Sequence, residues 1–339
     1  MNTKIDFNHL TMDYVKTDKR YVSVYRDGKW DEGRLTEDNT VTISESAAVF
    51  QYAQTIFEGL KAFRTAKGNI VIFRVDLNAD RFITSAERLV MPVFPKDRFI
   101  DAVIKTVDAN RDYVPPFDVK GSLYVRPFMI GSGPVINVVP ASEYQFRVYA
   151  TPLGSYFDAT TSSMKLNLSS YDRSAPNGTG HVKAGLNYAM SFYAGYRAKK
   201  QGFNENMYLD SKTRTYVEES GGANIIFIAE DGTLVVPQSP TILPSITRRS
   251  LIYIAKEYLN MKVDERPVRF SEIENFVECG LCGTAATISP VGLVHTETKD
   301  IRFRNSEHGL GEKMRLLFDT YNKIQKEEIE APKGWLTVI

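Results

Sequence analysis

The sequence predicts a mixed α/β protein built from two domains, and three observations support this fold class. The chain has 339 residues, which is more than one ordinary domain needs. Short strand-like runs alternate with amphipathic helical segments along most of its length. Pro, Gly, Ser and Thr accumulate around residues 151–164, as they do in connections. We therefore expect a small α/β domain over 1–152, a connection over 153–162 and a large domain over 163–339.

The composition indicates a globular protein with no excess of either charge. Hydrophobic residues make up 43% of the chain and charged residues 24%, which allows large buried cores. The 42 basic and 41 acidic side chains give a net charge of +1, so no surface for nucleic acid or a membrane stands out. Because the N-terminus is polar and no apolar run approaches the ~20 residues that span a bilayer, we expect a cytoplasmic protein.

The sequence predicts two hairpins, two helices and two long strands in the first half of the chain. Turn residues between apolar runs indicate the hairpins, at residues 21–29 and 60–73. Apolar residues at helical spacing predict helices over 75–90 and 99–107. Strands are expected at 123–130 and 144–149.

The second half of the chain carries helices and strands in alternation. The expected helices cover residues 186–201, 245–259 and 311–324. The expected strands cover 205–209, 224–229 and the region around 281–291.

Lys183 follows a Gly-rich turn over residues 177–182 and comes directly before a helix. A lone lysine is most often a solvated surface charge. A lysine that acts as an imine nucleophile has to lie where its amine can be neutral, and a tight turn at the bottom of a cleft provides such a place. Lys183 is therefore the first candidate catalytic residue.

Three further segments carry groups that could bind an aromatic, phosphorylated cofactor. Glu219 precedes a glycine pair and a strand, which is either a polar strand end or a carboxylate placed against a ring nitrogen. The loop over 239–249 ends in a helix start, where the N–H groups of Ile246 and Thr247 could bind an anion. Thr284, in a second turn of small residues, offers a hydroxyl. Arg126 is flanked by apolar strand residues and is costly to bury without a partner.

The only two cysteines, Cys279 and Cys282, have the spacing of a metal or redox pair. A metal site would need further ligands, and the four histidines lie in no ligand-like spacing. No proline stands between the cysteines, as a thioredoxin-like motif would require. We expect two reduced thiols and no metal.

Taken together, six segments in register resemble the branched-chain aminotransferases, which belong to the fold-type IV group of pyridoxal phosphate enzymes. The resemblance covers nearly the whole chain and is closest to the longer, eukaryote-like subgroup. It rests on Phe57-Glu58-Gly59, Arg126 within residues 123–127, Lys183 within 183–188, Glu219 five residues before Asn224, Ile246-Thr247-Arg248, and Gly283-Thr284-Ala285-Ala286.

The resemblance implies two domains with the active site at their interface, and a role for each residue at the cofactor. Lys183 would hold pyridoxal phosphate as a Schiff base and later move the proton. Glu219 would pair with the pyridine nitrogen, and Tyr188 would hydrogen-bond the phenolic oxygen of the ring. The phosphate would be bound by Arg81, by the N–H groups of Ile246 and Thr247, and by Thr284.

For the substrate, the resemblance implies an apolar pocket beside a carboxylate site. Its aromatic walls would be Tyr52, Phe57, Tyr124 and Tyr156. The backbone at Thr284 and Ala285 would hold the α-carboxylate. Arg126 would be available to the distal carboxylate of glutamate or 2-oxoglutarate.

The expected function is transfer of the amino group between leucine, isoleucine or valine and 2-oxoglutarate, by a ping-pong mechanism in a homodimer. Two alternatives stay open. One is a fold-type IV relative with another substrate, a D-amino-acid aminotransferase or an aminodeoxychorismate lyase. The other is a catalytically silent binding protein in which Lys183 is a surface charge.

Overall fold

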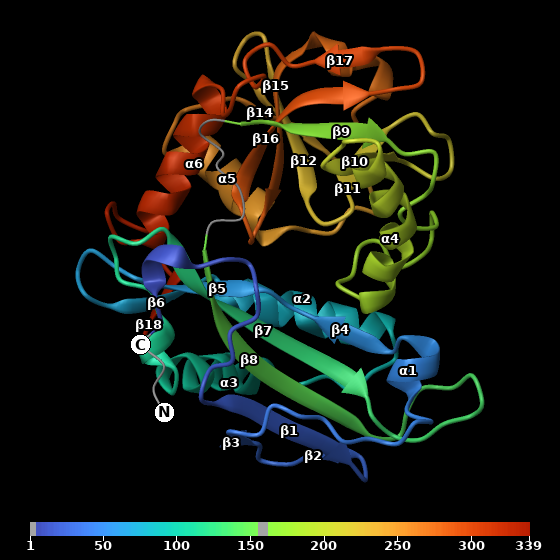
Figure 1. Ribbon diagram of the computed structural model, residues 1–339, viewed down its shortest axis with the longest axis vertical. Helices are drawn as coiled ribbons and strands as arrows, with labels where there is room; N and C mark the ends of the chain where they lie inside the picture. Colours follow the sequence, from blue (N-terminus) through green and yellow to red (C-terminus); the bar gives the residue numbers. More distant parts are fainter. Residues whose placement is uncertain (1–4, 155–161) are drawn as a thin grey trace. The chain divides into compact units, whose positions relative to one another are not determined.

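The computed structural model describes residues 5–154 and 162–339, and the chain folds into two compact units (Figure 1). Unit 1 comprises Met1–Tyr156, Val182–Leu186 and Lys323–Ile339, and unit 2 comprises Phe157–His181 and Asn187–Asn322. The expected large domain ran from residue 163 to the C-terminus. The structure instead groups the lysine segment and the C-terminal segment with unit 1, because their backbones pair with strands there.

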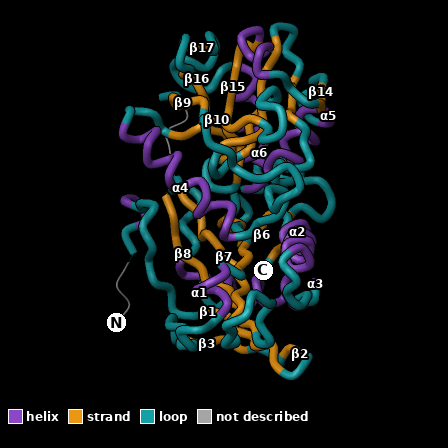
Figure 2. Tube along the Cα trace, turned by 90° about the vertical axis from the view of Figure 1, so that its right-hand side faces the viewer, coloured by secondary structure: helices purple, strands orange, loops and turns teal. Residues whose placement is uncertain are grey.

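Unit 1 is built on an antiparallel sheet whose strand order in the described residues is β18-β6-β5-β7-β8-β1-β2, with β3 beside β1 and β4 beside β7. The longest strands, β7 and β8, pair from Gly121↔Gly154 to Gly131↔Tyr144 and run side by side in Figure 2. The strands are β1 (Arg20–Arg26), β2 (Lys29–Trp30), β3 (Arg34–Thr36), β4 (Thr55–Phe57), β5 (Leu60–Arg64), β6 (Ile70–Phe73), β7 (Gly121–Gly131), β8 (Tyr144–Gly154) and β18 (Leu336–Val338).

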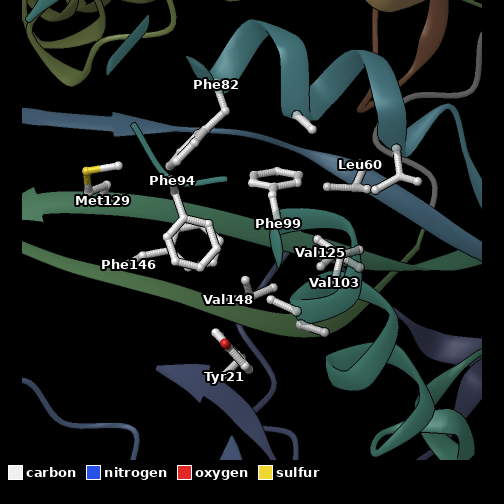
Figure 3. Packing of buried hydrophobic residues seen from close by; sticks show 14 of the residues in the cluster. Tyr21, Leu60, Phe82, Phe94, Phe99, Val103, Val125, Met129, Phe146 and Val148 are labelled. Atoms are coloured by element: carbon white, nitrogen blue, oxygen red, sulfur yellow. The ribbon is translucent and has the colours of Figure 1, made fainter. Parts of the chain in front are cut away.

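Helices α2 (Val75–Arg88) and α3 (Lys96–Asp108) pack on this sheet through an aromatic core. Phe82 and Phe99 from the helices meet Phe146 from β8, and Phe94 stacks on Phe146 with ring centroids 4.0 Å apart (Figure 3). The apolar residues of α2 and α3 recur at helical spacing, so one face of each helix is buried. A short helix, α1 (Ala48–Tyr52), precedes β4.

Unit 2 is built on a mixed sheet whose strand order in the described residues is β11-β10-β9-β16-β15-β12-β13-β14, with β17 beside β16. Its strands are β9 (Met164–Leu168), β10 (Glu205–Leu209), β11 (Val217–Ser220), β12 (Asn224–Ala229), β13 (Leu234–Pro237), β14 (Val263–Arg266), β15 (Phe276–Gly283), β16 (Thr287–His295) and β17 (Asp300–Arg302). Its helices are α4 (Gly185–Lys200), α5 (Ile246–Glu257) and α6 (Glu312–Gln325). The 3-10 turns of the chain are η1 (Phe7–His9), η2 (Arg111–Tyr113) and η3 (Phe270–Asn275).

The elements expected from the sequence are confirmed, with helix ends displaced by a few residues. The first hairpin turns at Asp27 and Gly28, which both have positive φ angles of 52° and 77°. Short strands such as β13, β14 and β18 were not predicted. Each of them has only three or four residues, so too few side chains exist to establish a periodicity.

The structure also bears on membranes and metals. Among the helices of the described residues, none is both long enough and apolar enough to cross a bilayer. Residues 5–154 and 162–339 contain no group of three or more His, Cys, Asp or Glu side chains arranged to hold a metal ion.

Candidate active site

The backbone of Lys183 is fixed on both sides by unit 1. Its N–H donates to the hydroxyl of Ser85 on α2 at 3.0 Å, and its carbonyl accepts the N–H of Phe57 at 3.1 Å. Ala184 forms a β-bridge with Ile56. The Nζ atom lies 4.8 Å from the centroid of the Phe57 ring, so the amine sits over an aromatic face. Lys183 is half-buried, which is unlike a solvated surface lysine.

The turn that carries Lys183 is closed by a pair of side chains in unit 2. The Thr179 hydroxyl donates to Asn187 Oδ1 at 2.7 Å, and Asn187 Nδ2 donates to the Thr179 carbonyl at 2.7 Å. Asn187 is buried in the first turn of α4. These two bonds tie the beginning of the turn to its end, so the loop between them is short and closed.

Arg126 lies among the aromatic residues expected to line the substrate pocket. Its guanidinium carbon is 4.8 Å from the Phe57 ring centroid and 5.2 Å from that of Tyr124, and Nη2 donates to the Tyr124 hydroxyl at 2.9 Å. A Cβ atom on Gly59 would lie 2.0 Å from that hydroxyl oxygen. The glycine of the Phe57-Glu58-Gly59 segment is therefore required because Tyr124 packs directly against its backbone.

Lys61 is a second amine beside this group, and the sequence pattern predicts no role for it. It lies on β5 opposite Tyr124 on β7. Burial lowers the pKa of Lys61 to about 8. It lies four residues after Phe57, close to a segment that indicated the family, and only cross-strand pairing brings it next to Tyr124.

Arg81, the expected phosphate ligand, forms a two-point ion pair with Glu58. Nε and Nη2 lie 2.7 Å from Oε1 and Oε2 of the carboxylate, and Asn78 donates to Oε2 at 2.7 Å. Glu58 is fully buried and Arg81 is 9% exposed. A phosphate bound by Arg81 would therefore contact N–H groups of the guanidinium that do not face this carboxylate.

Glu219 of unit 2 is buried, accepts two hydrogen bonds and forms one ion pair. Arg173 Nη1 and the Leu243 N–H reach Oε1 at 2.9 and 2.8 Å, and Asn224 Nδ2 reaches Oε2 at 2.8 Å. Burial raises the pKa of Glu219 to about 7, while Arg173 and the Leu243 N–H act against that rise. A carboxylate in this setting can hold or release a proton near neutral pH.

The start of α5 has the geometry of an anion site. Ser245 caps the helix by accepting the Arg248 N–H at 3.2 Å. The first-turn N–H groups, including those of Ile246 and Thr247, have no carbonyl partner within the helix. Burial lowers the pKa of Arg248, whose Nε has no hydrogen-bond partner in the described part of the chain. The N–H groups and this guanidinium together favour a negatively charged ligand.

Thr284 and Ala285 lie in the turn between β15 and β16. Thr284 is half-buried and Ala285 is exposed. The turn ends at Thr287, which is buried and has a φ of 61°. A β-branched residue in the left-handed region is strained, and such strain concentrates at functional sites.

The three remaining tyrosines of the expected site are Tyr52, Tyr188 and Tyr156. Tyr52 ends α1, and its hydroxyl donates to the Ile136 carbonyl at 2.6 Å, within unit 1. Tyr188 is half-buried in the first turn of α4. Tyr156 lies outside the described residues.

The structure thus brings Lys183, Phe57, Tyr124 and Arg126 together in unit 1, and Glu219 near the charge of Arg248 in unit 2. Arg173 and Asn224 were not predicted as functional residues. The signal for Asn224 was present, since it stands five residues after Glu219 and faces it across β11 and β12. Arg173 gave no such signal, because 46 positions of sequence separate it from its partner.

The two cysteines cannot pair with each other in this fold. They lie three residues apart on β15, so their side chains point to opposite faces of the strand. Both are buried, and burial raises the pKa of Cys279 well above its ordinary value and that of Cys282 to about 12. The structure agrees with two reduced, unreactive thiols.

A cavity of about 620 Å³ in unit 1 lies away from these residues. It is lined by Arg26, Lys29, Glu143 and Gln145, among others, and by none of the residues expected at the site. This cavity is polar, and half of its lining residues belong to β1, β8 and the loop before α1.

Comparison with known proteins gives consistent matches. The amino-transferase class IV family matches residues 55–294. The branched-chain-amino-acid aminotransferase of Haemophilus influenzae is 43% identical, with 99% of each chain covered. A branched-chain aminotransferase from Thermobaculum terrenum, described in its PLP form, has a similar structure with a TM-score of 0.79 at 25% identity, covering 96% of this chain and 99% of that one. The branched-chain aminotransferase of Escherichia coli matches with a TM-score of 0.79 at 25% identity, covering 95% and 99%.

Proposed function

The chain belongs to the class IV aminotransferases and, within them, to the branched-chain aminotransferases, and we propose that it exchanges an amino group between L-leucine, L-isoleucine or L-valine and 2-oxoglutarate. Its cofactor is pyridoxal 5'-phosphate, in line with the PLP form and the phosphopyridoxyl complex described for related structures. When bound, this cofactor supplies an aldehyde that takes up the amino group and a ring that accepts electrons.

Lys183 is proposed as the residue that binds the cofactor covalently and moves the proton. Ser85 and Phe57 hold its backbone on either side, so the amine has a defined position. The aromatic ring below Nζ excludes water from one side of the amine. An amine held in one place and shielded on one side meets the geometric requirement for directed proton transfer.

Unit 2 is proposed to hold the ring and the phosphate. Glu219 would face the ring nitrogen, since one acceptor position on Oε2 is not taken by the donors described above. The N–H groups of Ile246 and Thr247, together with the buried Arg248 guanidinium, fit a phosphate dianion. Tyr188, Thr284 and Arg81 are proposed to add contacts to the phenolic oxygen and the phosphate.

The substrate site is proposed to accept both an apolar and an acidic side chain. Phe57 and Tyr124 provide apolar surface, while Arg126 beside them provides a charge for a distal carboxylate. Tyr52 and Tyr156 are proposed as further walls, and the backbone at Thr284 and Ala285 as the site of the α-carboxylate. The close grouping of Lys183, Phe57 and Arg126 is the single observation that carries this proposal.

The proposal is tested by adding pyridoxal phosphate to the purified protein and recording its visible absorption. We expect a yellow protein, and we expect Lys183→Ala to lose the band that depends on a covalent bond. L-Leucine and D-alanine are then offered with 2-oxoglutarate. A protein that binds no pyridoxal phosphate contradicts the proposed chemistry, and faster turnover of D-alanine contradicts the branched-chain substrate class.

We further propose that the protein acts as a homodimer in the cytoplasm. Helix α4 supports the first part, because it exposes a row of large apolar side chains. Their exposed fractions are 51% for Met190, 71% for Phe192, and 58% for both Tyr193 and Tyr196. Contiguous apolar surface of this kind is typical of protein interfaces.

A further inference from the structure

Within the protein, Glu219 accepts two hydrogen bonds and forms one ion pair. An ionised carboxylate offers about four lone-pair sites, two on each oxygen. Oε1 accepts from the Leu243 N–H and lies 2.9 Å from Arg173 Nη1 in an ion pair, and Oε2 accepts from Asn224. One position on Oε2 is left, and no group in the described residues donates to it. The carboxylate is thus oriented with a single direction open to a donor.

The two hydrogen bonds and the ion pair also fix the orientation of the carboxylate. Leu243 contributes a backbone amide, which cannot rotate away. Asn224 faces Glu219 directly across β11 and β12, so its reach is set by the sheet register. Rotation of the carboxylate would break two hydrogen bonds and disturb the ion pair in a buried site, where each unpaired group is costly. The open position therefore keeps one direction.

Arg173 is the only ion-pair partner of Glu219 among the described residues, and both side chains are 2% exposed. Its Nη1 also reaches the Gly180 carbonyl at 3.4 Å, in the turn that carries Lys183. Gly180 has no room for a side chain, since a Cβ atom would lie 2.3 Å from the Thr241 carbonyl oxygen. Arg173 thus forms an ion pair with the carboxylate and a hydrogen bond to the turn that carries Lys183.

We propose that Arg173 is a positioning residue that keeps Glu219 ionised. The open acceptor position of Oε2 can then accept a hydrogen bond from the N–H of a protonated ring nitrogen. This inference rests on the proposed function, and it concerns where one proton resides. With Arg173 present, the proton is on the ring nitrogen and the carboxylate is negative. Without it, the buried carboxyl takes the proton and the ring nitrogen becomes neutral. No bond other than this N–H or O–H bond changes.

The energetic reason is the balance of charges in a buried site. Moving a single carboxylate out of water is costly, and burial alone favours its protonated form. Arg173 compensates that charge at 2.9 Å. Arg248 adds a weaker effect on Glu219, since its charge acts without a direct ion pair.

The test uses the holoprotein reconstituted with pyridoxal phosphate labelled with ¹⁵N in the ring. The chemical shift of that nitrogen reports its protonation and does not depend on turnover. Wild type is expected to give the shift of a protonated ring. Arg173→Met is expected to move the signal most of the way to that of a neutral ring, while Arg173→Lys, which keeps the charge, is expected to retain most of the wild-type shift.

Two further variants make the outcome specific. Glu219→Gln is expected to give the neutral shift, and adding Arg173→Met to it is expected to change nothing more. Arg20→Met is the matched control, because Arg20 is equally buried but donates only to backbone carbonyls in unit 1. It is expected to leave the shift unchanged.

The results separate the inference from the proposed function. A wild-type protein that binds no pyridoxal phosphate contradicts the function. A wild-type protein that binds it, with an unchanged ¹⁵N shift in Arg173→Met, overturns the inference alone. If Arg173→Met does not fold, the Arg173→Lys variant decides the question. A ¹⁵N shift of the neutral ring in Arg173→Lys, equal to that of Glu219→Gln, also overturns the inference.

Discussion

At the scale of single residues, the site depends on buried charges with few but well-defined partners. Glu219 has two hydrogen-bond donors and the Arg173 ion pair, Arg81 has the Glu58 carboxylate, and Arg248 has a buried Nε without a hydrogen bond in the described residues. Buried polar groups normally find partners, so an unpaired one at a helix start indicates a ligand. Glu219 and Arg248 are the residues whose chemistry is most changed by burial.

The stability of the cofactor-free protein is expected to depend on pH through Glu219. Its pKa rises from 4.5 in the unfolded chain to about 7 in the folded protein. Between these values the folded state binds more protons, so the free energy of unfolding falls as the pH rises. Glu219→Gln removes this contribution. Relative to wild type, the variant should gain roughly 2 kcal/mol between pH 5 and pH 8 in urea unfolding.

The control for this measurement is Glu230→Gln, since Glu230 is an exposed carboxylate of the same unit. The differences of both variants from wild type are measured at the same pH values. A Glu219→Gln variant whose stability follows the wild-type pH dependence would show that this carboxyl keeps an ordinary pKa in the fold.

At the scale of elements, short hydrogen-bonded segments hold the catalytic lysine and the helix beside it. The segment Val182–Leu186 bonds to β4 and α2, and Glu58, between β4 and β5, pairs with Arg81 on α2. Helix α2 is thus connected to the lysine backbone through Ser85 and to the sheet through Glu58. Displacement of α2 would move Lys183 with it.

Breaking the Glu58–Arg81 pair should destabilise unit 1 strongly. Glu58→Gln leaves a buried guanidinium without its compensating charge, and loss of one partner of a buried pair costs about 3–5 kcal/mol. Urea unfolding of the purified variant measures this cost. Glu143→Gln is the surface control, because its partner Arg26 is largely exposed and surface ion pairs contribute little to stability. Equal losses in the two variants would contradict the importance of burial.

At the scale of the whole molecule, each unit is a sheet with its own core, and the chain passes from unit 2 into unit 1 and back around Lys183. The exposed apolar side chains of α4 are the clearest sign that the molecule has a partner. A helix of a monomer usually places its apolar residues inward, but only Asn187, Ala194 and Ala198 are buried in α4. A second copy of the chain is the proposed occupant.

The proposed dimer is tested by light scattering coupled to size-exclusion chromatography. Wild type is expected at twice the chain mass of 38.3 kDa. The double variant Phe192→Asp/Tyr196→Asp is expected to have a measured mass closer to that of a single chain. A charge placed in a desolvated interface weakens association by several kcal/mol. Tyr253→Asp, on an exposed position of α5, serves as the control and should stay dimeric. A wild-type monomer would contradict the proposal.

The sequence alone determined the fold class, most elements and the identity of the reactive groups. Helices α2 and α3 follow from apolar periodicity, and β7 and β8 from long β-rich runs, because these patterns are local. The resemblance to the family rests on short segments and was confirmed by the match over residues 55–294. Lys183 and Glu219 were singled out because their neighbours in sequence are unusual.

Only the tertiary structure decided which groups act on one another. Arg173 reaches Glu219, Ser85 reaches Lys183 and Glu58 reaches Arg81 across 20 or more positions of sequence. The burial that shifts the pKa of Glu219 and Lys61 is a property of the packed units. The two cysteines are close in sequence, but their side chains point to opposite faces of β15 because they are three positions apart on that strand. Such distances and burial depend on long-range packing, which no local pattern encodes.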